Sequence, residues 1–180
     1  MTAKRRTADS IGATEERLTV ISTTGRNRTR SRIGARMTVP AQTARRFLTA
    51  LEQRKADEVR AMIASDVVAR FPVASGLSPA RLDGRDALMT HLKRAMATFD
   101  TLTYRVHTLV ADARTAVVEF SGQGTIQGRD DYTNDYLMIF SFDEAGRIRE
   151  LAEYYNPIRT ATYFGFVEVT PLVPDVTITL

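Results

Sequence analysis

The feature that most constrains the fold is the stretch 132–157, which reads YTNDYLMIFSFDEAGRIRELAEYYNP. Residues 132–141 alternate between two sets of side chains, with the period of two that is typical of a strand with two different faces. Residues 143–146 read as a turn, since Gly146 can adopt a positive φ, and residues 147–155 read as a return strand. We therefore expect a β-hairpin with one face against a core.

Glu153 is the most informative residue of this hairpin. The alternation places it on the same face as Leu151 and Tyr155, which favours an apolar setting. A carboxyl group in an apolar setting has a raised pKa and becomes a useful general acid or base near neutral pH. The alternative is a surface carboxylate paired with Arg147 or Arg149, and the alternation alone leaves both interpretations open.

The composition limits the chemistry of this chain, whose 180 residues suit one domain with a sizeable core. The absence of cysteine excludes disulfides and thiol catalysis. The histidines are His91 and His107, too few for a His-rich metal site, and we expect neither a metal nor a cofactor. No apolar run approaches the ~20 residues that cross a bilayer, and the sequence shows no secretory signal. We therefore expect no membrane partner and a cytoplasmic location.

Basic residues are concentrated at the start of the sequence. Residues 1–36 hold nine of the 25 lysines and arginines with only three acids, so the remainder of the chain is mildly acidic. A basic segment can bind nucleic acid or a membrane surface, and this one also resembles an organellar transit peptide. We interpret 1–36 as a flexible extension without a role in the chemistry, and we expect no nucleic-acid partner.

Helical patterns open the domain that we expect over residues 37–160. Thr38 can cap a first helix with Pro40 in its first turn, where a missing N–H is tolerated. Apolar residues then recur at helical spacing at Ala44, Phe47, Leu48 and Leu51. The next predicted elements are a short helix from Asp57, with Ile63 on its buried side, and a strand over 67–71. A loop over 73–82 and a helix over 84–99 follow, and Asp83 is the expected N-cap of that helix.

Strands dominate the second half of the chain. Besides the hairpin, patterns over 102–110 and 115–124 predict two further strands joined by short polar turns. Helices first and a strand meander last indicate an α+β fold, with N-terminal helices packed on one face of a curved antiparallel sheet. Beyond Pro157 we expect an irregular tail, 161–180, packed on the domain or on a neighbouring subunit.

Three segments in this order resemble the SnoaL-like branch of the NTF2-like, ketosteroid-isomerase-like proteins. They are residues 47–72, which end in DVVARFP, then LDGRDALMTHL at 82–92 and the hairpin 132–157. The closing EYYNP at 153–157 and HLKRAMATF at 91–99 are similar to the phenazine-biosynthesis A/B proteins. The resemblance covers about residues 40–160 and implies a cone-shaped fold, in which three helices close over a curved sheet, and a homodimer formed through the outer sheet face.

The resemblance also implies a site. In the phenazine relatives an acid and a histidine work together in the cavity, and the matching residues here are Glu153 and His91. A serine that those relatives carry one helical turn after the histidine is matched by Ala95, so a role for that hydroxyl has no counterpart. The acid and tyrosine of the steroid isomerases have no convincing match. The alternative for His91 is a core-edge histidine bonded to a backbone carbonyl.

Further residues are candidates to contact a ligand. The expected substrate-binding residues are Tyr104, Tyr136, Tyr155, Phe71 and Leu151. The tyrosines could hydrogen-bond a substrate oxygen, although such residues more often pack in a wall with a satisfied hydroxyl. Asn134 and Asp135 cannot both face the cavity, and the pattern leaves open which one does. His107 is interpreted as a surface or interface residue.

These observations favour a cofactor-independent enzyme acting by acid/base catalysis on a hydrophobic, polyketide-like or aromatic small molecule. The reaction would be an isomerisation, cyclisation, condensation or dehydration, in which Glu153 moves a proton and His91 orients the ligand or relays a second proton. The alternative is a non-catalytic ligand-binding or dimeric interaction module of the same fold. Epoxide hydrolysis, a third possibility, needs an Asp/Arg/Asp set that we do not find in the sequence.

Overall fold

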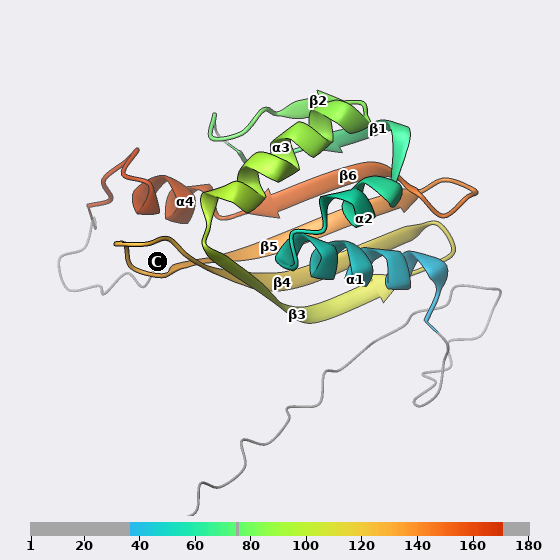
Figure 1. Ribbon diagram of the computed structural model, residues 1–180, viewed down its shortest axis with the longest axis horizontal. Helices are drawn as coiled ribbons and strands as arrows, with labels where there is room; N and C mark the ends of the chain where they lie inside the picture. Colours follow the sequence, from blue (N-terminus) through green and yellow to red (C-terminus); the bar gives the residue numbers. More distant parts are fainter. Residues whose placement is uncertain (1–36, 75, 171–180) are drawn as a thin grey trace, which may run out of the picture.

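A computed structural model describes residues 37–74 and 76–170 (Figure 1). The expected extension 1–36 and the end of the expected tail, 171–180, lie outside the described residues. The helices are α1 (Val39–Glu52), α2 (Ala56–Ala61), α3 (Arg85–Thr98) and α4 (Pro157–Tyr163). The strands are β1 (Ile63–Arg70), β2 (Arg81–Asp83), β3 (Thr101–Ala111), β4 (Thr115–Thr125), β5 (Tyr132–Phe142) and β6 (Ile148–Tyr155).

The six strands form one curved, open sheet in the order β2-β1-β6-β5-β4-β3. Neighbouring strands are antiparallel except β1 and β6, which are parallel. Helices α1, α2 and α3 cover one face of the sheet, and α4 lies at the end where β6 finishes (Figure 1). The predicted α+β class is confirmed, although the parallel pair makes the sheet mixed where we expected it to be antiparallel.

Helix α1 follows the sequence prediction closely. The Thr38 hydroxyl accepts a hydrogen bond from the Ala41 N–H at 3.3 Å, and Pro40 lies in the first turn. The predicted apolar stripe is fully buried at Ala44, Phe47, Leu48 and Leu51. The ring of Phe47 meets Phe140 of β5 edge-on, with 5.5 Å between the centroids, so α1 packs directly on the hairpin.

The segment between α1 and α3 differs from the prediction. Helix α2 ends at Ala61 and β1 begins at Ile63, whereas we expected Ile63 on the helix and a strand only from Val67. Ile63 is completely buried and pairs with Ile148 of β6. Pairing with β6 therefore makes Ile63 part of a strand, although its helical spacing predicted that it belongs to the helix. The expected loop 73–82 also ends in a short strand, β2, which pairs with β1.

Two expectations at helix ends are wrong. Gly84, with a φ of +85°, is the N-cap of α3, whereas Asp83 forms an ion pair with Arg81 at 2.7 Å. The chain beyond Pro157 begins as helix α4 and not as an irregular segment. The Asn156 side chain caps that helix by accepting a backbone N–H of the first turn, and Pro157 occupies the first turn itself.

The predicted hairpin is present as β5 and β6. Gly146 adopts a φ of +75° in the turn between them, as the sequence predicted. Along β5 the buried residues alternate with more exposed ones, whereas the buried residues of β6 are Ile148, Leu151 and Ala152. The hairpin therefore has one face toward the helices and one face away from them.

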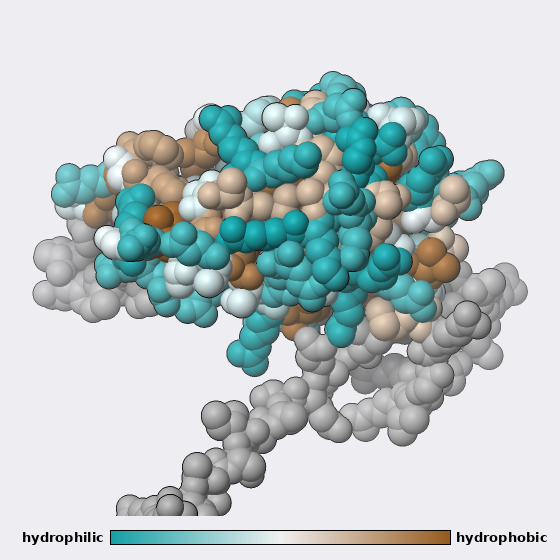
Figure 2. Space-filling view, in the orientation of Figure 1, coloured by the Kyte–Doolittle hydropathy of each residue, from teal (hydrophilic) through white to brown (hydrophobic). Residues whose placement is uncertain are grey.

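The helical side of the molecule is largely hydrophilic at its surface (Figure 2). None of the helices within residues 37–74 and 76–170 is long and apolar enough to span a membrane. Several large apolar side chains are nevertheless exposed, among them Leu137 on the outer sheet face and Phe166 after α4.

Candidate functional site

Glu153 lies on the helix-covered face of the sheet. In β6 it shares a face with Leu151, and across the hairpin it pairs with Met138. Met138 and Phe140 alternate onto the same face, and Phe140 contacts Phe47 of α1. Met138 and Leu151 are buried, while Glu153 itself is half-buried, so the carboxyl group keeps some access to solvent.

The carboxyl group of Glu153 is poorly solvated. Burial raises its pKa from 4.5 to about 7, and no charged partner opposes this effect. Within the described residues Glu153 has neither a hydrogen bond nor an ion pair. Arg147, one of its possible surface partners, instead pairs with Asp143 at 2.9 Å. At neutral pH the group is divided between its acid and base forms, which suits proton transfer in either direction.

Three tyrosines, Tyr104, Tyr136 and Tyr155, lie close to this carboxyl group and are called the tyrosine cluster below. The ring centroid of Tyr136 is 6.5 Å from that of Tyr104 and 6.3 Å from that of Tyr155. Burial raises the pKa of all three hydroxyls, and the charge of Glu153 raises each pKa further. The hydroxyls therefore stay protonated at neutral pH and can donate hydrogen bonds near Glu153.

The neighbouring strands position the tyrosine cluster. A Cβ on Gly122 of β4 would lie 3.0 Å from the Tyr136 ring and 3.2 Å from the Tyr104 ring. A glycine here lets both rings pack over the strand. The Phe120 ring stacks on Tyr136 with 5.0 Å between the centroids, and the backbone N–H of Tyr104 donates to the Glu52 carboxylate of α1. Packing on β4 and the hydrogen bond to α1 therefore hold the rings of Tyr104 and Tyr136 in place.

His91 approaches this region from α3. It is half-buried, and its ring centroid is 4.8 Å from that of Phe71. Burial lowers the pKa of His91, so the imidazole is neutral at pH 7. Phe71 follows Arg70, which pairs with Ala152, so Phe71 lies beside the end of β6 that carries Glu153. No hydrogen bond or ion pair joins His91 to Glu153 in the described part of the chain.

Two of the expected ligand contacts are core residues. Phe71 and Leu151 are each only 1% exposed and belong to the buried apolar cluster between helices and sheet. They form the apolar support around Glu153, whereas the partly accessible residues of this region are His91 and the tyrosine cluster.

The structure decides between Asn134 and Asp135. Asn134 is completely buried on the helix-covered face, whereas Asp135 is exposed on the other face and pairs with Arg159 at 3.4 Å. The Asn134 amide hydrogen-bonds the hydroxyl of Tyr132, which in turn lies 3.2 Å from the hydroxyl of Tyr136. Sequence reasoning missed Tyr132 as a site residue, although it shares the face of Tyr136 in the period-two pattern.

The structure offers no support for a metal site in the residues it describes, where no group of three His, Asp or Glu side chains could hold an ion. His107 is exposed at a bulge of β3, and its Nε2 lies 3.0 Å from the Ser121 hydroxyl. This exposed location is compatible with the surface or interface position that we expected for His107.

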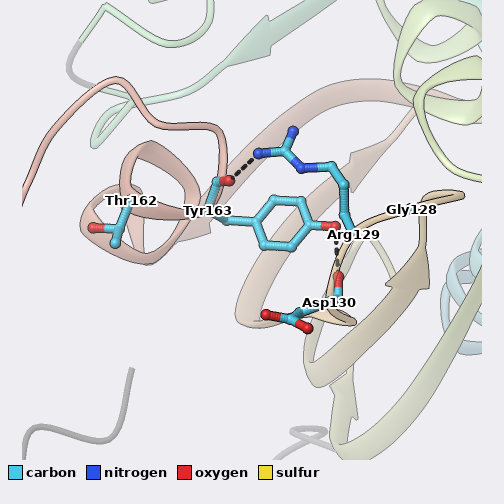
Figure 3. A pocket seen from close by; sticks show the side chains of 5 residues that line it. All are labelled: Gly128, Arg129, Asp130, Thr162 and Tyr163. Atoms are coloured by element: carbon cyan, nitrogen blue, oxygen red, sulfur yellow. Dashed lines mark hydrogen bonds between the residues drawn. The ribbon is translucent and has the colours of Figure 1, made fainter.

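A separate, open hollow of about 620 Å³ lies between the β4–β5 turn and α4 (Figure 3). It is lined by Gly128, Arg129, Asp130, Thr162 and Tyr163. Arg129 donates to the Tyr163 carbonyl at 2.6 Å, and the Tyr163 hydroxyl donates to the Asp130 carbonyl at 2.8 Å (Figure 3). None of the residues predicted to act in the site lines this hollow.

Comparison with known proteins agrees with this architecture. Residues 44–151 match the family described as SnoaL-like domain. Among curated proteins, the chain is 24% identical over 127 residues to the uncharacterized protein YesE of Bacillus subtilis, an alignment that covers 69% of this chain and 86% of that protein.

Solved structures with the same cone-shaped α+β fold carry several different names. A phenazine biosynthesis-related protein from Pseudomonas aeruginosa superposes with a TM-score of 0.62 at 18% identity, covering 78% of this chain and 94% of its own. A putative isomerase from B. subtilis gives 0.59 at 22% identity, covering 71% and 93%. An LEH-like epoxide hydrolase from M. tuberculosis gives 0.56 at 21% identity, covering 71% and 87%. At these identities the similarity shows the fold alone.

Proposed function

Because the chain belongs to the SnoaL-like family, we propose that it is an enzyme that moves protons on a hydrophobic small molecule bound beside the tyrosine cluster. The observation that carries the proposal is the carboxyl group of Glu153, whose pKa burial raises to about 7 and which no other group neutralises. Groups with such perturbed pKa values concentrate at functional sites.

The proposed step is the removal of a proton from a carbon next to a carbonyl group. The C–H bond breaks, the proton forms an O–H bond on the Glu153 carboxylate, and the electron pair moves onto the carbonyl oxygen. Tyr104 or Tyr136 donates a hydrogen bond to that oxygen as its negative charge develops. Return of the proton at another position gives isomerisation, whereas attack of the carbanion on a second carbonyl gives cyclisation or condensation.

His91 has a supporting role in this proposal. Its neutral ring beside Phe71 can accept or donate one hydrogen bond, which suits orienting the ligand or relaying a second proton. A polyketide-like or aromatic ligand fits the setting, because aromatic rings and buried aliphatic side chains surround Glu153. The names of the phenazine-related protein and of the putative isomerase are compatible with such a ligand.

We also propose a homodimer through the outer sheet face. This face carries Leu137, which is 36% exposed, and the half-buried Ile139 beside the exposed Asp135 on the same strand. An apolar strip with a polar border is the composition that interfaces favour.

Proton transfer to solvent tests the proposed chemistry without knowledge of the natural substrate. A panel of aromatic and aliphatic ketones is incubated with the protein in D2O, and loss of the α-hydrogen signals is followed by proton NMR. The variants are Glu153→Gln and, as a matched control, Glu150→Gln, which makes the same change at an exposed position on the opposite face of β6. We expect exchange above the buffer rate for the parent protein and for the control, and the buffer rate for Glu153→Gln.

The outcomes separate the competing functions. Equal exchange by Glu153→Gln and the parent protein would make Glu153 a structural residue and end the proposal. Ligand binding without exchange in any variant would favour the binding module. Conversion of epoxides to diols that is lost in Glu153→Gln would instead favour hydrolysis, although no arginine or aspartate contributes to the pKa of Glu153.

A further inference from the structure

A hydrogen-bond network centred on two buried side chains, Tyr132 and Asn134, lies behind Tyr136, on the side of β5 that faces α4. Its members are Tyr132, Asn134, Tyr136, Asn156 and Thr160. Tyr132 is 4% exposed and Asn134 is 0% exposed, so these polar side chains are removed from water and depend on each other for hydrogen bonds. The network connects the tyrosine cluster to the first turn of α4.

The orientation of the Asn134 amide is fixed by its backbone partners. Its Oδ1 accepts the N–H of Asp135 at 2.8 Å and the N–H of Asn156 at 3.2 Å. A backbone N–H can only donate, so this atom must be the oxygen. The Nδ2 group then has two hydrogens to share among three neighbouring oxygens, which are the Tyr132 hydroxyl at 2.8 Å, the Thr160 hydroxyl at 2.9 Å and the Asn156 carbonyl at 3.1 Å.

Because the Nδ2 group of Asn134 can only donate, the single proton of the Tyr132 hydroxyl must point elsewhere. Its two other neighbours are the Tyr136 hydroxyl at 3.2 Å and the Thr160 hydroxyl at 3.0 Å. Thr160 can place its own proton on the Asn156 carbonyl at 3.3 Å. When Tyr132 donates to Tyr136, the Tyr136 proton is released from the network and can point at a ligand.

We propose that Tyr132, held by Asn134, is a positioning residue that directs the O–H of Tyr136 at a carbonyl-type oxygen of the bound ligand. The inference rests on the proposed function, because it uses Tyr136 as the group that contacts the ligand. Hydrogen bonds in a chain polarise one another, so a Tyr136 hydroxyl that accepts from Tyr132 is a stronger donor than an isolated one. A ligand without an acceptor oxygen gains nothing from this arrangement, so the network also selects for carbonyl compounds.

The test uses acetophenone labelled with ¹³C at its carbonyl, with binding followed by calorimetry and the carbonyl stretch by infrared difference spectroscopy. Tyr132→Phe removes the relevant hydroxyl, keeps the ring contact with Phe99 at 5.1 Å, and leaves Thr160 and Asn156 as acceptors for Asn134. Tyr163→Phe is the matched control. Its ring also contacts Tyr132, at 5.0 Å, but its hydroxyl bonds the Asp130 carbonyl outside the network.

The parent protein and the Tyr163→Phe control should bind acetophenone and lower its carbonyl frequency to the same extent. Tyr136→Phe should remove most of the shift in the carbonyl frequency. It should also weaken binding about fivefold, which is the typical net contribution of one hydrogen bond to affinity. Tyr132→Phe should weaken binding about threefold and move the band toward its position in Tyr136→Phe, because Tyr136 loses the donor that polarises it.

An unchanged carbonyl band and affinity in Tyr132→Phe, with both altered in Tyr136→Phe, would overturn the inference and leave the proposed function intact. Two other results would show that Tyr136 does not contact the ligand: no binding of acetophenone to the parent protein, or a carbonyl band that Tyr136→Phe does not move. Either result would overturn the inference together with the proposed function on which it rests. Thermal unfolding of each variant, expected within a few degrees of the parent, confirms that the changes in the band do not come from a damaged fold.

Discussion

Replacement of Glu153 by glutamine should stabilise the folded chain at alkaline pH and leave its stability unchanged at acidic pH. The folded state holds the Glu153 proton up to a pKa of about 7, whereas the unfolded chain releases it near 4.5. Between these values the folded state binds more protons than the unfolded state, so stability falls as pH rises. Below 4.5 both states are protonated and the contribution vanishes, and above 7 the full penalty is present.

The size of the penalty follows from the two pKa values. Each pKa unit corresponds to 1.36 kcal/mol, so a pKa of about 7 against 4.5 amounts to about 3 kcal/mol at pH 8. Glutamine has nearly the same shape and no charge, so it avoids this penalty. An amide still has to be desolvated, and partial access to solvent lowers the gain. We therefore expect the free energy of unfolding of Glu153→Gln to exceed that of the parent protein by about 2–3 kcal/mol at pH 8 and by less than about 0.5 kcal/mol at pH 4.5.

Urea unfolding at several pH values between 4.5 and 8.5 measures this difference, with Glu150→Gln as the control. Glu150 is exposed on the opposite face of the same strand, so its replacement should change stability by less than about 0.5 kcal/mol at every pH. A titration of carboxyl ¹³C shifts should also show one glutamate with a midpoint near 7 that is missing in Glu153→Gln. Equal stability of Glu153→Gln and the parent protein at pH 8 would mean that the carboxyl group is well solvated, and the case for acid/base chemistry would lose its basis.

Three further predictions concern other parts of the structure. Gly124→Ala should destabilise the fold by about 1–3 kcal/mol in urea unfolding, because the new Cβ would lie 2.6 Å from the Phe99 ring and force it to move. The pKa of His91 in the folded chain should lie below 6.5 in an NMR titration. As pH drops from 7.5 to 5 the unfolded chain is then protonated at His91 before the folded chain, so the free energy of unfolding should decrease. The decrease should be smaller in His91→Gln. Leu137→Arg should convert the proposed homodimer to a monomer in light scattering, and a parent protein that already runs as a monomer would contradict the dimer.

The sequence predicted those elements whose signals are local. A period of two over 132–141 and a glycine turn were sufficient to predict the hairpin, because each strand pairs with its direct neighbour in sequence. Helix α1 was predicted by Thr38, Pro40 and an apolar stripe, all within a few turns of one another. The same alternation placed Glu153 with Leu151, and the structure has both on the helix-covered face.

Elements that depend on distant partners were not predicted. Nothing within residues 61–66 indicates a strand, and β1 begins at Ile63 because the chain there meets β6, more than 80 residues later. Helical spacing and strand pairing compete for such a short apolar segment, and tertiary contacts decide between them. The choice between Asn134 and Asp135 also depended on contacts with distant parts of the chain. Alternation separates the two residues, but only the packing of α1 and α4 shows which face is inside.

Asn134 and Glu153, both on the inner face of the hairpin, show that the site contains a group that the fold does not need. Asn134 is buried and every part of its amide has a partner, so it stabilises the junction between β6 and α4. Glu153 lies on the same face and has no hydrogen bond within the described residues, at a cost of about 3 kcal/mol when it is ionised. An apolar residue of similar size would remove that cost and would fit between Met138 and Leu151. The carboxyl group of Glu153 thus weakens the fold, and it lies beside the three hydroxyls of the tyrosine cluster, which can donate to a ligand. This arrangement is best explained by a reaction that needs an acid with a pKa near neutrality.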